Sequence, residues 1–325
     1  MSFHSLVSNF WPATIQGLVL GSIYALIALG YTLVYGVLRL INFAHSEVFM
    51  LSAFGSFIAL NILGVPHRLA DGKDPYKSGW PLVGTLAFML VVSLLFGGVV
   101  AVLLERIAYR PLRKRNAPRL VFLISAIGAS FAMSEAVGHW GPKHTDDYAL
   151  QRIFKKTKVF SFFGADVRND YIFVVVGSLI MMAGLALFVN RSRTGRGIRA
   201  VAQDMDTARL MGVNVDLIIL ITFLVGGIMA GAAAFFFEVY NGSARYSLGF
   251  DLGVKAFTAA VLGGIGNIKG ALVGGLALGV IENWGATLFG SNQKMGTVTA
   301  FVVLVLVLML RPTGLLGESL GRARA

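Results

Sequence analysis

The sequence predicts an all-α polytopic membrane protein, and three observations carry that prediction. Apolar residues make up 56% of the 325 residues and charged residues only 14%, far from the balance of a soluble protein. Several stretches of about 20 residues contain no charged side chain, which is the length that a helix needs to cross a bilayer core of about 30 Å. Barrel strands would instead alternate in polarity over about ten residues, so helices are the remaining way to satisfy the backbone in lipid.

The apolar segments predict about 8 to 10 transmembrane or half-spanning helices. The first segment has no basic region before it, so we expect a retained helix rather than a cleaved signal peptide. The seventh is short and ends near Gly263, Gly264 and Gly266, which favours a half-spanning or re-entrant helix. In order, the segments are 13–38, 43–63, 82–104, 120–140, 171–189, 217–240, 252–266, 271–289 and 295–310.

Basic residues indicate how the chain is oriented. The net charge is +12, and Lys and Arg gather in the short loops 105–119 and 190–216, which we expect in the cytoplasm. Counting spans from these loops places the N-terminus outside and the C-terminus in the cytoplasm. Loop 141–170 also contains lysines, which argues against the external location that this orientation requires. Its length and its aspartates weaken that argument. The charge is explained by orientation and lipid contact, with no nucleic acid as a partner.

Motifs for catalysis and for cofactor binding are absent from the sequence. The chain has no cysteine, and its five histidines lack the spacing of metal ligands. No G-x-x-x-x-G-K-[ST] phosphate loop occurs, and no nucleophile, paired carboxylates or metal motif can be placed together. We therefore expect no metal, no cofactor and no enzymatic activity in this chain, so that an ATPase would be a separate subunit.

A polar cluster between the first two apolar segments is the main candidate for a substrate pathway. Asn42, His45, Ser46 and Glu47 follow one another there, and either an interfacial turn or a broken helix lining a cavity would explain them. Lys255 lies near the start of the seventh segment, which is expected to run in the opposite direction. The starts of the second and seventh segments are therefore candidates for the related parts of an inverted repeat, in which substrate sites lie at the repeat interface.

Other ionisable residues also fall inside apolar segments, where they are costly and tend to be functional. They are Glu135, Glu238 and Glu282. For Glu238 and Glu282, which lie toward the outer ends of their segments, the alternative is a role at the membrane interface.

The loop 190–216 carries a candidate coupling element. Apolar residues recur at steps of three and four over 198–211, which predicts one short amphipathic cytoplasmic helix that Gly212 ends. Such a helix either lies on the membrane surface or docks into a groove of a partner protein. The candidate coupling residues are Arg199, Asp204, Asp206, Ala208, Arg209 and Gly212.

Four stretches together closely resemble the branched-chain amino acid ABC-transporter permease family. Residues 206–212 also look like a relaxed form of the family's coupling motif, with Asp206 for Glu and Thr207 for Ala. Ser46 departs from the family pattern, which usually has Gly there. The four stretches are GLVLGSIYALIALGYTLVYGVLRLINFAHSE (17–47), GRGIRAVAQDMDTARLMGVNVD (195–216), AVLGGIGNIKGALVGGLALGVIE (260–282) and RPTGLLG (311–317).

The sequence has no linker or low-complexity segment, so we expect one membrane-spanning permease domain over residues 1–325. The resemblance implies that it lies in the bacterial inner membrane. It implies a binding-protein-dependent ABC importer for branched-chain or related small amino acids. Its partners would be a second homologous permease subunit, two cytoplasmic ATPase subunits and an external substrate-binding protein. A urea or short-chain amide permease shares these motifs, and an ion-coupled secondary carrier is the alternative from another class.

Overall fold

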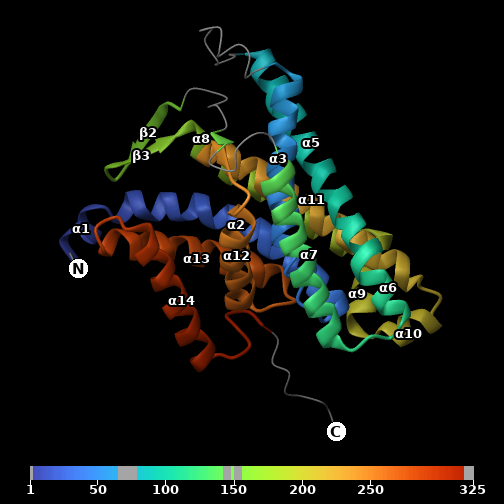
Figure 1. Cartoon of the computed structure of the whole chain (residues 1–325). Coiled ribbons are helices and arrows are strands. Elements are labelled where there is room, and N and C mark those ends of the chain that lie inside the picture. Colours follow the sequence, from blue (N-terminus) through green and yellow to red (C-terminus); the bar gives the residue numbers. More distant parts are fainter. Residues whose placement is uncertain (1–2, 65–78, 142–147, 150–155, 318–325) are drawn as a thin grey trace.

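The computed structural model describes residues 3–64, 79–141, 148–149 and 156–317, and it is an all-helical membrane fold with short β elements (Figure 1). Eight helices within the described residues are long and apolar enough to cross a membrane. They are α2 (Phe10–Leu38), α3 (His45–Ile62), α5 (Trp80–Leu104), α7 (Arg119–Trp140), α8 (Asn169–Arg191), α11 (Val215–Asn241), α13 (Ile268–Leu288) and α14 (Gln293–Leu310).

The seventh apolar segment forms α12 (Leu248–Gly263), a helix of only 16 residues. At 1.5 Å per residue it is about 24 Å long, shorter than the bilayer core. All the helices expected from the apolar segments are therefore present. The half-spanning character expected of the seventh agrees with its length.

Short elements complete the described chain. A π-helical turn, η1 (Glu105–Tyr109), continues α5 into α6 (Arg110–Lys114), and α1 (Phe3–Ser8) precedes α2. Strand β1 (Tyr148–Ala149) pairs antiparallel with β4 (Ser243–Ala244). Strands β2 (Lys158–Phe162) and β3 (Ala165–Arg168) form a hairpin whose turn, Phe163–Gly164, has positive φ at both residues, as a two-residue type I′ turn requires.

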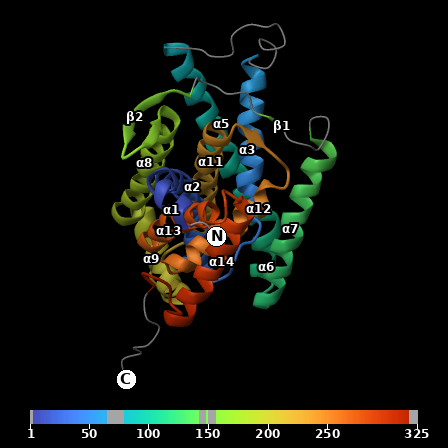
Figure 2. The ribbon, with the colours of Figure 1, turned by 90° about the vertical axis from the view of Figure 1, so that its left-hand side faces the viewer.

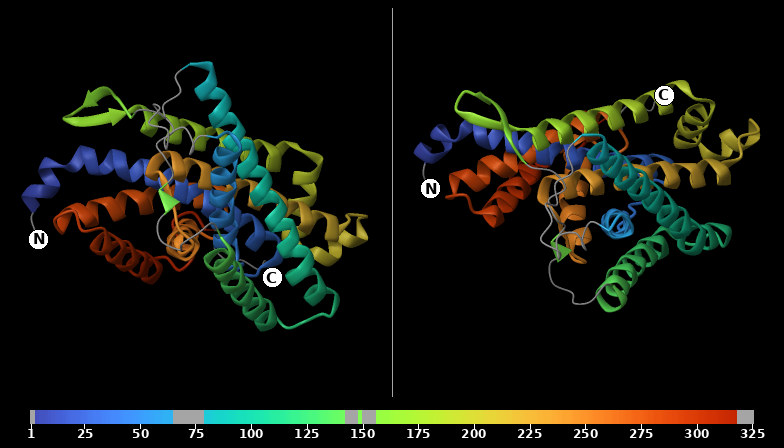
Figure 3. Two further views of the ribbon diagram at one scale, coloured as in Figure 1. Left: turned by 45° about the horizontal axis from the view of Figure 1, so that its top comes forward. Right: turned by 90° about the horizontal axis from the view of Figure 1, so that it is seen from above.

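Helix α2 is the centre of the fold and the outer helices surround it. Its apolar window is 89% buried, whereas those of α7 and α14 are only 11% buried. Helices α13, α11, α12 and α8 all pack on α2, and α7 lies at the edge of the molecule in Figures 2 and 3. The weakly buried helices present apolar side chains outward, which suits contact with lipid.

Glycines allow α2 and α13 to pack closely. A Cβ atom placed on Gly21 would lie 2.8 Å from the Cα of Leu276, and one placed on Gly275 would lie 2.5 Å from the Cα of Ala25. Such distances leave no space for a side chain, so the two backbones touch directly. Small residues spaced four apart are the usual means of such close packing between membrane helices.

The single amphipathic helix expected over 198–211 is wrong in one respect, because the structure has two helices there. Helix α9 (Arg193–Gln203) ends at Asp204, and α10 (Met205–Leu210) begins after it. The Asp204 side chain accepts a hydrogen bond from the Thr207 amide at 2.7 Å, so this residue starts a new helix instead of continuing the old one. Gly212 has φ of 81°, which confirms the expected left-handed stop.

Single-cysteine labelling is expected to define the orientation, because the chain has no cysteine of its own. Phe163→Cys, on the hairpin turn, should react in intact cells with a maleimide that does not cross membranes. Leu210→Cys, at the end of α10, should react only after the cells are permeabilised, in cells that produce this chain without partner subunits. Both side chains are well exposed, at 73% and 88%. The reverse pattern would invert the proposed topology.

Candidate functional site

The polar cluster of Asn42, His45, Ser46 and Glu47 forms a polar break between α2 and α3. It begins where α2 ends. Arg39 has a left-handed backbone, with φ of 51°, which ends α2 after Leu38. Its guanidinium donates hydrogen bonds to the carbonyl oxygens of Ala202 and Gln203, at 3.4 and 3.3 Å. The last residues of α9 therefore hold the position from which the chain turns toward α3.

His45, the first residue of α3, is enclosed by α2. Its ring meets the Tyr31 ring edge-on, with centroids 4.9 Å apart, and fills the space beside Gly30. The side chain is 1% exposed and is hydrogen-bonded to the Ile27 backbone. Its Nε2 atom has no hydrogen-bond partner within the described part of the chain.

Ser46 and Glu47 place the first turn of α3 against the first turn of α12. Ser46 packs on Gly253, and the Glu47 carboxylate lies against Gly249, where neither position has room for a Cβ. Ser130 of α7 donates a hydrogen bond to Glu47 Oε1 at 3.2 Å. The two stretches compared in the sequence as an inverted repeat are thus direct neighbours.

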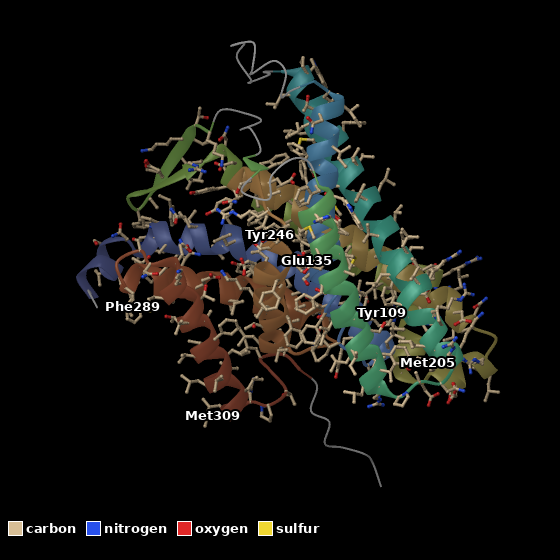
Figure 4. All side chains as sticks on the ribbon, viewed as in Figure 1. Tyr109, Glu135, Met205, Tyr246, Phe289 and Met309 are labelled. Carbon is tan, nitrogen blue, oxygen red and sulfur yellow. The ribbon has the colours of Figure 1, made fainter. Side chains whose placement is uncertain are left out.

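Asn42 joins this region to the end of α5. Its Oδ1 accepts a hydrogen bond from the hydroxyl of Tyr109 at 2.9 Å, and both side chains are buried. Tyr109 lies in η1, and Figure 4 shows it beside α7, where its ring centroid lies 6.1 Å from that of Phe122. The π-helical turn, a feature often found at functional sites, therefore positions a side chain that contacts the polar break.

Lys255 is held by a different network. Its Nζ atom lies 2.5 Å from Glu282 Oε1, which also accepts a hydrogen bond from Thr297 at 3.1 Å. The other oxygen of Glu282 accepts one from the Tyr24 hydroxyl at 2.9 Å. Glu282 is 2% exposed, so this carboxylate joins α2, α12, α13 and α14 inside the protein.

Two further buried acids have different surroundings. Glu238 of α11 is 2% exposed, and neither of its carboxylate oxygens has a hydrogen-bond partner among the described residues. Glu105 accepts a hydrogen bond from Arg113 at 2.9 Å, and the same guanidinium bonds Asp216 at 2.8 Å. The Arg113 guanidinium therefore joins Glu105, at the end of α5, to Asp216, at the start of α11.

In the loop 190–216, α9 forms a base next to α8, and Leu210 and Met211 at the end of α10 form an apolar tip. Arg199 donates a hydrogen bond to the Val189 carbonyl of α8, so the base is fixed to a spanning helix. Ala208 is buried, whereas Leu210 and Met211 are 88% and 80% exposed. Two large apolar side chains are thus highly exposed just before the turn at Gly212.

The charged residues of the same loop serve its local structure. Arg209 lies 3.6 Å from Asp206 in an exposed ion pair. The Thr207 amide donates to the Asp204 carboxylate and lowers the pKa of that carboxyl below its usual value. This hydrogen bond stabilises the charged form, as expected at a helix N-terminus.

Several residues of the site were not identified from the sequence. Tyr24 and Tyr31 are seven residues apart on α2, a spacing that places both on one face of a helix, and this signal was available. Tyr109 and Ser130 gave no signal, since their role depends on how α5 and α7 reach the polar break. No group of three His, Cys, Asp or Glu residues that could hold a metal occurs in the described ranges.

Comparison with known proteins shows which family the chain is similar to. Its sequence matches the family described as "Branched-chain amino acid transport system / permease component" over residues 13–308. The chain belongs to this family. The resemblance seen in the four sequence stretches is therefore confirmed, and with its candidate spans the chain is a multi-pass membrane permease component.

Two relatives show how far this family likeness extends. The high-affinity branched-chain amino acid transport system permease protein BraD of Pseudomonas aeruginosa is 42% identical over 317 residues, covering 96% of this chain and 97% of the relative. The corresponding protein LivH of Escherichia coli K12 is 38% identical over 313 residues, covering 95% and 96%. The solved structure of PsaBC from Streptococcus pneumoniae covers 96% of this chain and 94% of its own, with 13% identity and a TM-score of 0.42.

Proposed function

We propose that this chain is the permease subunit of a binding-protein-dependent ABC importer for branched-chain or related small amino acids, located in the cytoplasmic membrane. It works with a second homologous permease subunit, two cytoplasmic ATPase subunits and an external substrate-binding protein. The names of its relatives support the amino acid substrate. Because the chain has no phosphate loop, the energy of ATP must come from the partner subunits.

The observation that carries this proposal is the exposed tip of α10. Leu210 and Met211 are large apolar side chains in contact with water in the isolated chain. Exposed apolar residues at the end of a short helix are typical of a helix that inserts into a groove of a partner. The coupling role proposed for Arg199, Asp204, Asp206, Ala208, Arg209 and Gly212 is to build and orient this tip.

The substrate path in this proposal passes the junction between α3 and α12. Asn42, His45, Ser46 and Glu47 are buried polar residues brought together at one place, where small side chains and glycines keep the two first turns in contact. The role of Lys255 is to hold α12 in position through Glu282. A small shift of α12 along α3 would change the surroundings of Glu47.

Reconstitution tests the proposed function directly. Proteoliposomes containing this chain with its three kinds of partner should take up leucine only when ATP and the binding protein are both supplied. Uptake driven by an ion gradient without ATPases would show a secondary carrier instead. Uptake of urea or acetamide in preference to leucine would assign the chain to the amide branch.

Gly212→Val is expected to uncouple ATP hydrolysis from substrate. Valine is strained at the φ of 81° found here, at a cost of about 1–2 kcal/mol, so the turn after Met211 should change direction. Substrate-stimulated ATP hydrolysis should fall several-fold, while membrane insertion stays normal because nothing surrounds this position within 4 Å. Gly212→Asn is the matched control, since asparagine adopts the left-handed conformation. Equal stimulation in the two variants would contradict the coupling role.

A further inference from the structure

An apolar groove runs along the contact between α5 and α11. These two helices pack on each other (Figure 1), and a Cβ placed on Gly97 would overlap the carbonyl oxygen of Gly227. The backbones therefore touch, and the side chains beside the contact leave a cavity of about 430 Å³ whose lining residues are all apolar. Its walls include Leu95, Val99, Leu103, Leu224 and Ile228.

The groove has the length of one bilayer leaflet. Its lining residues Val91 and Leu103 are twelve residues apart on α5, which is about 18 Å along the helix axis. Half of a bilayer core of about 30 Å is about 15 Å. Leu95, Val99 and Leu103 are 62%, 56% and 49% exposed, so the groove is open along its side. An acyl chain of one leaflet therefore fits its length.

The same pair of helices forms a polar cavity of about 280 Å³ just beyond this groove. One helical turn after Leu103, Arg106 lines it, and Arg110 follows. On α11, Leu220 lines the polar cavity and lies one turn before Leu224 of the groove. The basic loop 105–119 begins here, so this cavity lies at the depth where lipid headgroups are found.

The charge in the polar cavity is positive on balance. Its two carboxylates, Glu105 and Asp216, both bind Arg113, at 2.9 and 2.8 Å. Arg106 and Arg110 add two further cations. The Nε atom of Arg110 is buried and has no hydrogen-bond partner within the described part of the chain. Three guanidinium groups thus exceed two carboxylates, and the cavity favours an anion.

Simpler occupants match only half of this arrangement. A lipid with any headgroup could fill the apolar groove, but a zwitterionic one would bring no net negative charge to Arg106 and Arg110. A free phosphate ion would bind the arginines and leave the groove to other contacts. An anionic phospholipid supplies both parts in the right order, with an acyl chain in one leaflet and a phosphate at its surface. Basic pockets between membrane helices are known to bind such headgroups.

We infer that the groove between α5 and α11 and the polar cavity at its end form a binding site for one anionic phospholipid. Its phosphate binds Arg106 and Arg110, and one of its acyl chains lies in the groove. The lipid belongs to the leaflet on the side of loop 105–119, which is cytoplasmic in the expected orientation. It adds a second link between α5 and α11 beside the one that Arg113 makes. The site is independent of the substrate that the permease carries.

Native mass spectrometry of the full chain in detergent measures the recognition of the headgroup. Dioleoyl phosphatidylglycerol should bind roughly 10- to 100-fold more tightly than dioleoyl phosphatidylcholine, the expected effect of hydrogen bonds to a charged group. Arg106→Gln combined with Arg110→Gln should remove this preference and leave the binding of phosphatidylcholine unchanged. Excess inorganic phosphate should not displace the lipid.

The matched control removes two arginines of the same loop that do not line the cavity. Arg115→Gln combined with Arg119→Gln makes the same change in net charge at exposed positions and should keep the preference for phosphatidylglycerol. Equal binding of the two lipids to the wild type, or an equal effect of the two double variants, would overturn the inference. Displacement by inorganic phosphate would show a site for a free anion only and would overturn it as well.

Fluorescence quenching in liposomes locates the acyl chain. A bimane on Val99→Cys should be quenched more by brominated phosphatidylglycerol than by the same mole fraction of brominated phosphatidylcholine. Leu187→Cys is the matched control, because Leu187 is 61% exposed and lies near the end of α8, as Val99 lies near the end of α5. The two lipids should quench a bimane at Leu187 equally.

Two outcomes of the quenching experiment would contradict the lipid site. Equal quenching of the Val99 label by both lipids would show that the groove holds ordinary bilayer lipid. Loss of the quenching when the proposed second permease subunit is added would assign the groove to that subunit instead.

Discussion

Replacing Gly275 with alanine is expected to destabilise the protein by about 1–3 kcal/mol, the usual cost of overpacking a well-packed site. The new Cβ would lie 2.5 Å from the Cα of Ala25, so the backbones of α2 and α13 must separate. This contact is at the centre of the fold, and the change should lower the thermal unfolding midpoint in detergent. Gly275→Val should prevent accumulation of folded protein in the membrane.

Gly184→Ala is the matched control for this prediction. Gly184 lies within α8, and a Cβ there would have no atom within 4 Å. Alanine is the better helix former, so this variant should be as stable as the wild type or slightly more. If both alanine variants unfold at the same temperature, close packing of α2 on α13 contributes little to stability.

Lys255→Met is expected to destabilise the protein by about 3–5 kcal/mol, because it leaves a buried carboxylate without its cation. Glu282 would keep only the hydroxyl groups of Tyr24 and Thr297 as partners. Unfolding in detergent with increasing dodecyl sulfate measures the effect. Lys269→Met removes an exposed lysine near the start of α13 and should change stability little.

A double-mutant cycle separates the ion pair from the loss of lysine packing. Lys255→Met combined with Glu282→Gln removes both charges, so the double variant should be more stable than the sum of the two single effects predicts. Additive effects would show that the pair makes no net contribution. Co-purification of the ATPases should be retained in the double variant, since the network is remote from the tip of α10.

Much of the fold could be predicted from hydrophobicity alone. Runs without charge fix the spans, and the glycines near Gly263 explain why α12 is short. The break at Asp204 was missed because apolar residues keep a helical spacing through both α9 and α10, from Ile198 to Ala208. The capping hydrogen bond from the Thr207 amide to Asp204 ends one helix and starts the next. The spacing of apolar residues does not reveal such a bond.

The candidate site was only partly predictable, because its geometry depends on contacts between distant segments. The sequence identified Asn42, His45, Ser46 and Glu47 as a polar break, and the structure brings them together with the opening of α12. Lys255 was expected in the same pathway, but the structure pairs it with Glu282. The sequence does not show this pair, because the two residues lie on different helices. Ser130 could be found only once the path of α7 was known.

The hydrogen bonds from Arg39 to the end of α9 make a mechanical linkage of two otherwise separate parts. In the proposed complex, a force applied at the exposed tip of α10 would pass through α9 to the Ala202 and Gln203 carbonyls. It would then be delivered at Arg39, three residues before Asn42 and six before His45. The movement of a partner bound at this tip, as proposed above, would therefore need no relay through the long spanning helices to reach the polar break, because only a few residues connect the two.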